Sequence, residues 1–349
     1  MYVVDLELLD ETLARRSEPA FRARQVWAWA AGGASDYAEM TDLPGALRSA
    51  LASEVPFSSL TLEREARARD GTVKALFSTA DGRPLEAVLM RYRDGRRSLC
   101  VSSQSGCALD CAFCATGRMR FARNLTPSEI IDQALHFRRL DGGAPLTHCV
   151  FMGMGEPMLN LDAVLAACER LPDLGVSHRH TTVSTVGWLP GIEALAAQPL
   201  PLRLALSVHA ADEALRSELM AVNERYPLAD VIDAARAFYA RKRRRVFVEY
   251  VMLAGVNDRY QQALALARLL APRRHEADRP IFKVNLIPYN PIGESDRFTG
   301  SSRAAIAAFA AALSEHGVPA TVRLTRGREI DAACGQLAAR EAQRAGRAG

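Results

Sequence analysis

Short apolar runs alternate with helical segments through the last two thirds of this 349-residue chain, and this alternation limits the possible fold more than any other feature. The segment Thr126-Pro127-Ser128-Glu129 combines a capping box with a proline at the first helical position, which predicts a helix before the first run. Repeated strand–helix units require a parallel sheet, either doubly wound or curled into a barrel. Right-handed crossovers bring the carboxyl ends of such strands to one rim, where ligands bind. The predicted strands are residues 148–152, 180–185, 202–208, 246–252, 282–287 and 320–324.

The first hundred residues follow different patterns. Residues 1–57 have helical periodicity and lack catalytic residue patterns. The next extended runs, TVKALFSTA, PLEAVLMRYR and RRSLCVSSQ, are separated by Asp-Gly dipeptides, which type I′ hairpin turns prefer. These runs predict a β-meander over residues 58–99 that leads directly to the alternating region, residues 100–349. The dipeptides are Asp70-Gly71, Asp81-Gly82 and Asp94-Gly95.

Several function classes are disfavoured by what the chain lacks. It contains no GxxxxGK[ST] phosphate loop and no GxGxxG dinucleotide fingerprint. It shows no secretory signal and no apolar run of the roughly 18 residues that span a bilayer, so we expect a soluble, cytoplasmic protein. Seven cysteines, an odd number, predict reduced thiols rather than a disulfide framework. The net charge is only +4, but a basic run at 241–245 is either a solvated helix end or a contact for a polyanion.

The segment CALDCAFC places Cys107, Cys111 and Cys114 just after the meander's last strand, on the predicted ligand-binding rim. Three thiols in eight residues rarely occur together by chance. A zinc site would need a fourth ligand, which His178, His180 or His209 could supply. A redox CxxC pair would leave the third thiol unused. An iron–sulfur cluster held by three cysteines, with one iron open to a ligand, uses all three.

The spacing CxxxCxxC after the first strand of a partial barrel resembles the radical S-adenosylmethionine (SAM) superfamily, in which SAM itself completes the coordination of the cluster. The resemblance implies a partial (βα)6 barrel, a [4Fe-4S] cluster on Cys107, Cys111 and Cys114, and SAM as cofactor. Read from the residues alone, the other rim positions are turn or capping residues; the resemblance implies that they bind SAM. These positions are Gly155 and Glu156 in GMGEP, Ser184, Ser207, Val208, His209 and Asn290.

Within that superfamily, the chain resembles the RlmN family of dual-specificity RNA methyltransferases, which methylate carbon 2 of adenine. The matching segments are RRSLCVSSQSGCALDCAFCATG, FARNLTPSEI, GMGEP, VNLIPYNP and TRGREIDAACGQLAAR, with FRARQVWAWA and EMTDLP near the N-terminus. The resemblance implies that Cys334 is methylated in the first half-reaction, using one of two SAM molecules. It further implies that Cys100 later forms a transient disulfide with Cys334 and that Glu86 accepts a proton. Cys149 and Cys168, in apolar segments, are expected in the core.

The implied substrates are adenine 2503 of 23S rRNA and adenine 37 of some tRNAs. The resemblance also implies an RNA-binding accessory role for residues 1–57, phosphate contacts by residues 241–245 and Arg323 to Arg328, and an electron donor such as a flavodoxin or ferredoxin. We expect a monomer without membrane partners. Two alternatives stay open: a Cfr-type enzyme that methylates adenine carbon 8, and a non-enzymatic RNA-binding protein stapled by a metal.

Overall fold

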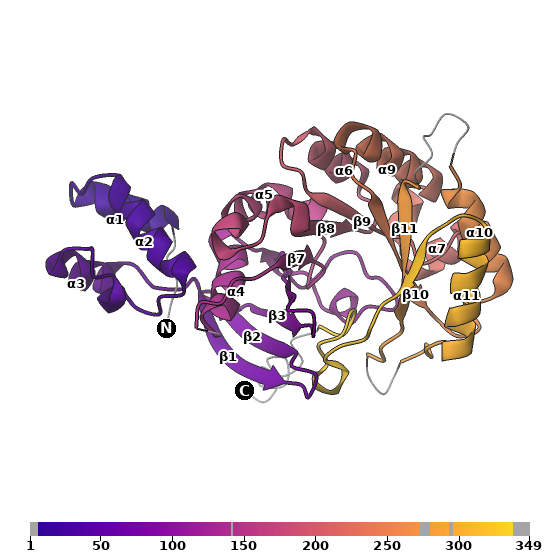
Figure 1. Ribbon diagram of the computed structural model, residues 1–349, viewed down its shortest axis with the longest axis horizontal. Coiled ribbons are helices and arrows are strands. Elements are labelled where there is room, and N and C mark those ends of the chain that lie inside the picture. Colours follow the sequence, from indigo (N-terminus) through magenta and orange to yellow (C-terminus); the bar gives the residue numbers. More distant parts are fainter. Residues whose placement is uncertain (1–5, 141, 273–279, 293–295, 338–349) are drawn as a thin grey trace.

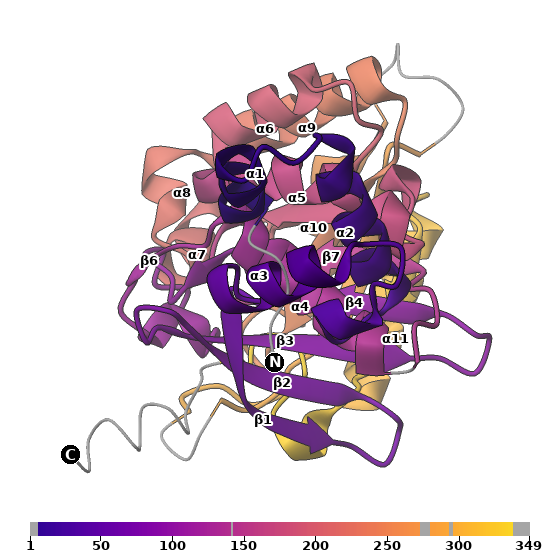
Figure 2. The ribbon, with the colours of Figure 1, turned by 90° about the vertical axis from the view of Figure 1, so that its left-hand side faces the viewer.

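The N-terminal helices form a small unit that lies beside the rest of the molecule (Figure 1). The computed structural model describes residues 6–140, 142–272, 280–292 and 296–337. Helices α1 (Leu6–Arg15), α2 (Phe21–Gly32) and α3 (Gly45–Glu54) pack their apolar faces together. Trp27 joins this unit to the remaining chain, since its indole Nε1 donates to Asp173 Oδ2 over 2.7 Å. Figure 2 looks onto these helices and shows the meander strands beneath them.

The predicted meander is present, but its turns differ from the expected type. Strands β1 (Leu60–Arg67), β2 (Val73–Thr79), β3 (Pro84–Arg91) and β4 (Arg97–Cys100) pair antiparallel in sequence order. At the first turn Gly71 N donates to Ala68 O, and Ala68 N donates to Thr72 O. Only the glycine of each Asp-Gly pair has positive φ. The expected type I′ turns are therefore wrong: each loop is a type I turn followed by a left-handed glycine, which the dipeptide also permits.

The predicted parallel strands are confirmed, and they continue the same sheet. The sheet order is β1-β2-β3-β4-β7-β8-β9-β10-β11-β12, with parallel pairing from β4 onward. Because β4 belongs to both the meander and the parallel region, the two parts share one hydrogen-bonded framework. The later strands are β7 (His148–Phe151), β8 (Thr181–Thr185), β9 (Arg203–Ser207), β10 (Val246–Met252), β11 (Phe282–Pro288) and β12 (Ala320–Val322).

The longer helices form an outer arc around this curved sheet (Figure 1). Helix α4 begins as predicted, because Thr126 N donates to Glu129 Oε2 and Glu129 N donates to Thr126 Oγ1. The outer helices are α4 (Pro127–Leu140), α5 (Leu161–Arg170), α6 (Leu189–Ala197), α9 (Leu228–Lys242), α10 (Tyr260–Leu270) and α11 (Arg303–Glu315). The 3-10 turns are Tyr37–Glu39, Thr116–Arg118, Pro157–Asn160, Leu171–Leu174, His178–His180 and Arg328–Ile330.

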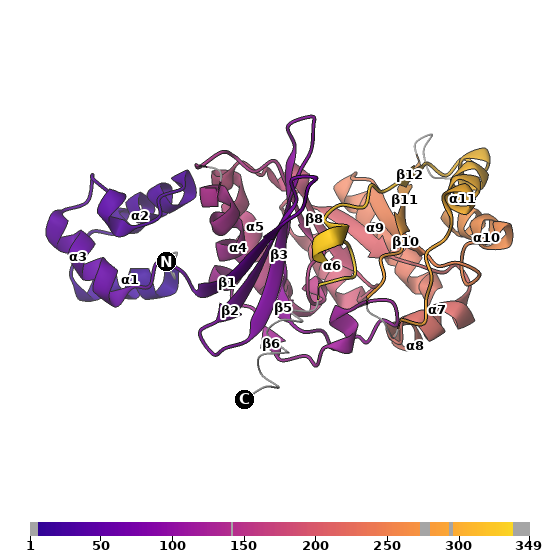
Figure 3. The same ribbon diagram turned by 90° about the horizontal axis from the view of Figure 1, so that it is seen from below.

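Side chains alternate along each parallel strand between the helices and the concave face. In β10, Tyr250 faces outward and packs against Phe309 of α11, with 5.1 Å between ring centroids. Its neighbours Glu249 and Val251 face the concave side and line a cleft. The segments that follow strand ends gather along one edge of the molecule in Figure 3. They are β5 (Gln104–Ser105), β6 (Arg123–Asn124), α7 (Glu213–Leu219) and α8 (Val222–Arg225).

The described helices include none that is both long and apolar enough to cross a bilayer.

Candidate active site

A cleft of about 950 Å³ lies at the carboxyl ends of the parallel strands. It collects side chains from the loop after β4, the ends of β7 to β11 and the segment after β12. This is the rim at which the alternation predicted a ligand site. Nine of the residues selected from the sequence line this cleft: Cys107, Cys111, Cys114, Gly155, Glu156, Ser184, Ser207, His209 and Cys334.

The three clustered thiols line the cleft together. Burial raises the pKa of the Cys107 thiol to about 12, with smaller contributions from the charges of Cys114 and Glu156. Burial also raises the pKa of Cys111, whereas the Arg216 guanidinium acts in the opposite direction. Free thiols at Cys107 and Cys111 would be protonated, so a bound cation is needed to hold these two as thiolates.

The described residues contain no group of three His, Cys, Asp or Glu side chains spaced to hold one metal ion. This geometry gives no support to a mononuclear zinc site. The ligands of a four-iron cluster bind different iron atoms, so three thiols that line one cleft without converging on a point fit such a cluster.

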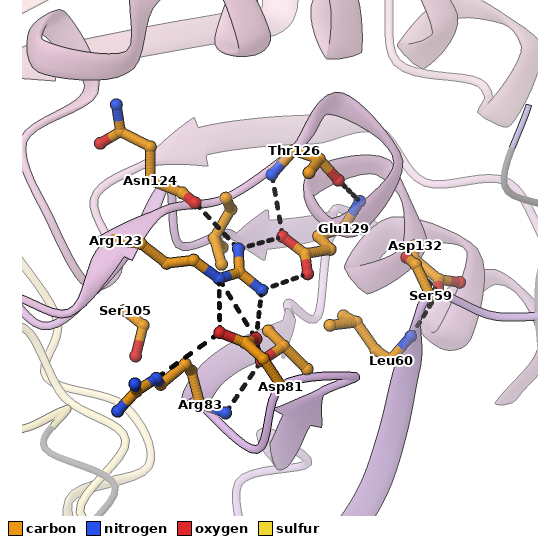
Figure 4. Close-up of polar contacts among 12 residues, drawn as sticks. Ser59, Leu60, Asp81, Arg83, Ser105, Arg123, Asn124, Thr126, Glu129 and Asp132 are labelled. Carbon is orange, nitrogen blue, oxygen red and sulfur yellow. Dashed lines mark hydrogen bonds and ion pairs between the residues drawn. The ribbon is translucent and has the colours of Figure 1, made fainter. Parts of the chain in front are cut away.

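Arg123, just beyond the cysteine loop, ties that loop to the meander and to α4 (Figure 4). Its guanidinium donates to both carboxylate oxygens of Glu129, at 2.8 and 2.7 Å, and to Asp81 Oδ1 at 2.7 Å. Asp81 belongs to the turn between β2 and β3. Bidentate Arg–carboxylate pairs fix direction as well as distance. These contacts therefore fix the end of the cysteine loop to the meander through Asp81 and to α4 through Glu129.

Glu156 is buried, and its carboxylate accepts hydrogen bonds from Met158 N at 3.1 Å and Val186 N at 3.0 Å. Burial raises the pKa of Glu156 to about 7, against the lowering effect of these bonds. Gly155 has a φ of 95°, and a Cβ added there would lie 2.5 Å from Gln104 Cβ. Glycine is therefore required for this close approach, which lets Glu156 N donate to Gln104 Oε1 over 2.8 Å.

The remaining rim residues take different places. Ser184 Oγ donates to Phe151 O, and Ser207 ends β9. His209 is buried, and its Nδ1 accepts from Val251 N at 3.0 Å. Burial and the nearby Arg216 lower the pKa of His209 to about 3, so this imidazole is neutral. Val208 is also buried, but it packs in the hydrophobic core and does not line the cleft.

A second cavity, of about 1150 Å³, lies between the meander, β11 and the C-terminal segment. Cys100 and Asn290 line this second cavity rather than the cleft. Cys334 lines both cavities. Burial raises the pKa of Cys100 to about 12, and the charge of Cys334 adds to this effect. The structure thus places Cys334 between the clustered thiols and Cys100.

Backbone contacts hold the Cys334 segment over the barrel. Ala115 N donates to Gly335 O at 2.8 Å, and Gln336 Nε2 donates to Pro291 O at 2.9 Å. Asn290 Nδ2 contacts Cys334 O at 3.4 Å. The Cys334 side chain is exposed to solvent, although it sits in a concavity where the surrounding protein raises its pKa. The thiol is therefore accessible from both cavities.

Glu86 lies on β3 and lines neither of the two cavities. It is buried, and its Oε1 pairs with Lys74 Nζ at 2.9 Å. Lys74 Nζ also donates to Asp331 O at 3.3 Å, three residues before Cys334. Glu86 is thus coupled to the cysteine-bearing segment through Lys74.

Sequence reasoning missed two charged residues around the thiols, and it missed the place of a third, Arg323, beside them. Arg216 is fully buried, and its Nη2 donates to Val186 O at 2.6 Å beside the cleft. Glu249 lines the cleft and accepts from Asn285 Nδ2 at 2.7 Å. Arg323, interpreted earlier as a phosphate contact, lies 3.9 Å from Glu249 Oε2 and lowers the pKa of both Cys100 and Cys334. A carboxylate inside the apolar run VFVEYVM was the available signal for Glu249.

The two cysteines expected in the core, Cys149 and Cys168, are fully buried there.

Comparison with known proteins gives matches over nearly the whole chain. Residues 101–267 match the radical SAM superfamily model, and residues 3–56 match the ribosomal RNA large subunit methyltransferase N-terminal domain. A probable dual-specificity RNA methyltransferase RlmN from Chloroflexus aurantiacus is 48% identical, covering 97% of this chain and 93% of that protein. A protein of the same description from Gemmatimonas aurantiaca is 50% identical over 95% of this chain and 90% of its own.

A solved structure confirms the fold. The crystal structure of a radical SAM methyltransferase from Sphaerobacter thermophilus has a TM-score of 0.87 and 43% sequence identity, covering 97% of this chain and 99% of that one. Radical SAM enzymes use a [4Fe-4S] cluster and SAM. A cleft with three clustered thiols and a buried carboxylate suits both groups. With 48% identity over nearly its full length, the chain belongs to the RlmN family of radical SAM RNA methyltransferases.

Proposed function

We propose that this protein methylates carbon 2 of adenine in RNA, at position 2503 of 23S rRNA and at position 37 of some tRNAs. The observation that carries the proposal is the position of Cys334, which lines both the cluster cleft and the cavity that contains Cys100. A thiol in this position can receive a methyl group at the cleft. In the second cavity, Cys100 can then free it from the thioether that forms with RNA.

In this proposal Cys107, Cys111 and Cys114 hold the [4Fe-4S] cluster. Gly155 and Glu156 bind the amino group of SAM, because a buried carboxylate that lines the cleft suits an ammonium ion. The further SAM contacts are Ser184, Ser207, Val208, His209 and Asn290. Asn290 lines the second cavity and would reach SAM from that side. Val208 would act through its backbone, since its side chain is in the core. When bound, the cluster and SAM supply methyl groups and a hydrogen-abstracting radical.

The protein's own residues then handle the carbon unit. The Cys334 thiolate accepts a methyl group as a nucleophile, drawing on one of the two SAM molecules that each turnover consumes. The S-methyl group would lose one hydrogen atom to the radical that bound SAM supplies, and its carbon would then bond to adenine C2. Loss of one electron to the bound cluster and of the C2 proton would leave a thioether between Cys334 and the RNA. Cys100 would attack the Cys334 sulfur, so that an S–S bond forms while the S–C bond breaks with its electron pair on carbon. That carbon would take up a proton to complete the methyl group, and a dithiol reductant would then reduce the disulfide. We assign acceptance of the C2 proton to Glu86, although its side chain lines neither cavity and is held by Lys74.

The RNA partners follow from the same proposal. The target base must leave its stack to reach the cleft, so the RNA around that base needs contacts with the protein outside the cleft. We assign this task to the N-terminal unit, residues 1–57, with residues 58–99 linking it to the barrel of residues 100–349. A flavodoxin or ferredoxin supplies electrons, and the protein acts as a cytoplasmic monomer.

Mass spectrometry of RNA nucleosides tests the proposal. Anaerobically reconstituted protein with SAM, a reductant and 23S rRNA transcript should produce 2-methyladenosine. A Cys334→Ala variant should produce none, whereas Cys168→Ala, which removes a core thiol, should retain activity. Appearance of 8-methyladenosine alone would favour the Cfr-type alternative. A colourless zinc protein that binds RNA without methylating it would favour the non-enzymatic one.

A further inference from the structure

A second concave surface lies at the opposite end of the barrel from the cleft. It is an open groove of about 940 Å³, formed where β9, β10 and β11 begin and where α9 ends. Five of its residues are cations, and two are aromatic. These residues are Arg203, Arg243, Arg244, Arg245, Lys283, Tyr239 and Phe247.

The strand register places the groove and the cleft on the same concave face of the sheet, at successive positions along the strands. In β10, Phe247 lines the groove, whereas Glu249 and Val251 line the cleft. Phe247 pairs with Lys283 of β11, which also lines the groove. Along β10, Phe247 lies two residue steps from Glu249 and four from Val251, which is about 7 and about 13 Å at roughly 3.3 Å per step. The groove and the cleft therefore have different lining residues on the same strand.

The groove brings five cationic side chains close together. In the described part of the chain, no ion pair involves Arg203, Arg243, Arg244, Arg245 or Lys283. Burial lowers the pKa of Arg244, and the positive charges of Arg203 and Arg179 lower it further. The groove thus concentrates positive charge, and a bound anion would reduce the repulsion between these cations.

Neighbouring atoms also fix the orientation of the Arg244 and Arg203 guanidinium groups. Arg244 Nη2 donates to Arg179 O at 2.7 Å, whereas its Nε is buried with no hydrogen-bond partner in the described structure. Arg203 lies over the Phe247 ring, 5.9 Å from its centroid. Arg243, Arg244 and Arg245 follow the carboxyl end of α9, where the helix dipole stabilises positive charge. That explanation does not cover Arg203 and Lys283, which lie on strands.

We propose that this groove binds backbone phosphates of the RNA substrate, at a site separate from the one that receives the target adenine. The inference rests on the proposed function, because it takes RNA as the partner. Arginine forks recognise phosphate oxygens in pairs, and aromatic rings beside them suit nucleotides. An electron-donor protein is a poorer fit, since it must approach the cluster at the other end of the barrel. The groove therefore anchors a distant part of a large, folded RNA.

The experiment compares two RNAs and two charge-matched variants of the full-length, cluster-loaded protein. One variant is Arg243→Gln with Arg245→Gln, both exposed in the groove region. The control is Arg268→Gln with Arg303→Gln, which removes two exposed charges from α10 and α11. Kd is measured at several salt concentrations for a 23S rRNA transcript and for a short stem-loop carrying the target adenine.

The groove variant should bind the transcript about tenfold more weakly, and the slope of log K against log salt should become shallower by about two, one for each lost phosphate contact. Its Kd for the stem-loop and its methylation of the stem-loop should match those of the control. A lysine version, Arg243→Lys with Arg245→Lys, should restore most of the slope, and this restoration excludes misfolding as the cause.

Three results would overturn the inference. Unchanged transcript binding would show that the groove does not contact RNA. Equal weakening for both RNAs would place these arginines at the target-base site. Unchanged RNA binding with slower reduction by flavodoxin would assign the groove to an acidic protein. In each case 2-methyladenosine formation by the wild-type protein still reports on the proposed function separately.

Discussion

Cys100 and Cys334 line the same cavity, although one ends β4 and the other follows β12. The two strands lie far apart in the sheet order, so the C-terminal segment must cross back over the barrel to bring the thiols together. Cys100 is buried on a rigid strand, whereas Cys334 is exposed on an irregular segment. The buried Cys100 thiol therefore suits the group that breaks the thioether, and the accessible Cys334 thiol suits the group that carries the carbon.

Replacing Cys100 with alanine should trap the protein on its RNA. Without the Cys100 thiol, nothing attacks the Cys334 sulfur to break the thioether, so a covalent adduct should accumulate in cells. Denaturing gel electrophoresis before and after ribonuclease treatment would detect it. Cys168→Ala is the matched control and should give no adduct, because Cys168 lies in the core. Continued methylation by Cys100→Ala without any adduct would remove Cys100 from the mechanism.

Arg323 should control the reactivity of Cys334. The protein that surrounds the concavity partly desolvates the Cys334 thiol and raises its pKa, and the Arg323 cation opposes that rise. In Arg323→Gln the opposing charge is lost, so the pKa should rise further and the thiolate fraction at pH 8 should fall. The pH profile of Cys334 alkylation, followed by mass spectrometry of the cluster-free protein, should shift to higher pH.

Arg326→Gln is the control for this measurement. Arg326 is close in sequence, but it pairs with Asp70 at 3.8 Å and stacks on Tyr92. Its removal should leave the midpoint of the alkylation profile near that of the wild type. Equal shifts in both variants would mean that general loosening of the segment, rather than the Arg323 charge, sets the reactivity.

Asp70 fastens the Cys334 segment to the meander. Its Oδ1 accepts from Thr72 N at 2.9 Å, and its Oδ2 accepts from Gly327 N at 3.2 Å. Asp70→Ala should therefore increase amide hydrogen exchange across residues 325–337 and reduce methylation several-fold, at a cost of about 1 kcal/mol in unfolding free energy. Asp94→Ala, in the equivalent turn between β3 and β4, should change neither exchange across residues 325–337 nor methylation, because among the described residues Asp94 bonds within its own turn.

The sequence predicted the fold and most of the cleft because both depend on local patterns. Apolar runs and capping residues specify the strands and α4, and parallel strands must end on one rim. The pairing of Cys100 with Cys334 came from family resemblance, since no local pattern encodes a contact between β4 and the last segment. The roles of Arg216 and Arg323 were missed because burial and charge partners depend on tertiary packing. The basic run at 241–245 was visible, but its place opposite the cleft was not.

Asp132 should make the stability of the protein depend on pH. Its Oδ2 accepts from Ser59 Oγ at 3.1 Å and Leu60 N at 3.2 Å, which joins α4 to the start of β1 (Figure 4). Burial raises the pKa of Asp132 to about 6, above the usual aspartate value of 3.8. The folded state then binds the proton more tightly than the unfolded state. Stability from this group is fully present below pH 3.8 and is lost as the pH rises to about 6.

Across that interval the loss should be on the order of 3 kcal/mol. Asp132→Asn keeps an acceptor for the same hydrogen bonds but cannot ionise, so its advantage over the wild type should grow from pH 4 to pH 7. Urea unfolding at a series of pH values measures the difference. Asp162→Asn, at an exposed position on α5, provides the control and should run parallel to the wild type. A constant difference for Asp132→Asn would mean that the Asp132 carboxylate stays ionised throughout and that its hydrogen bonds outweigh its burial.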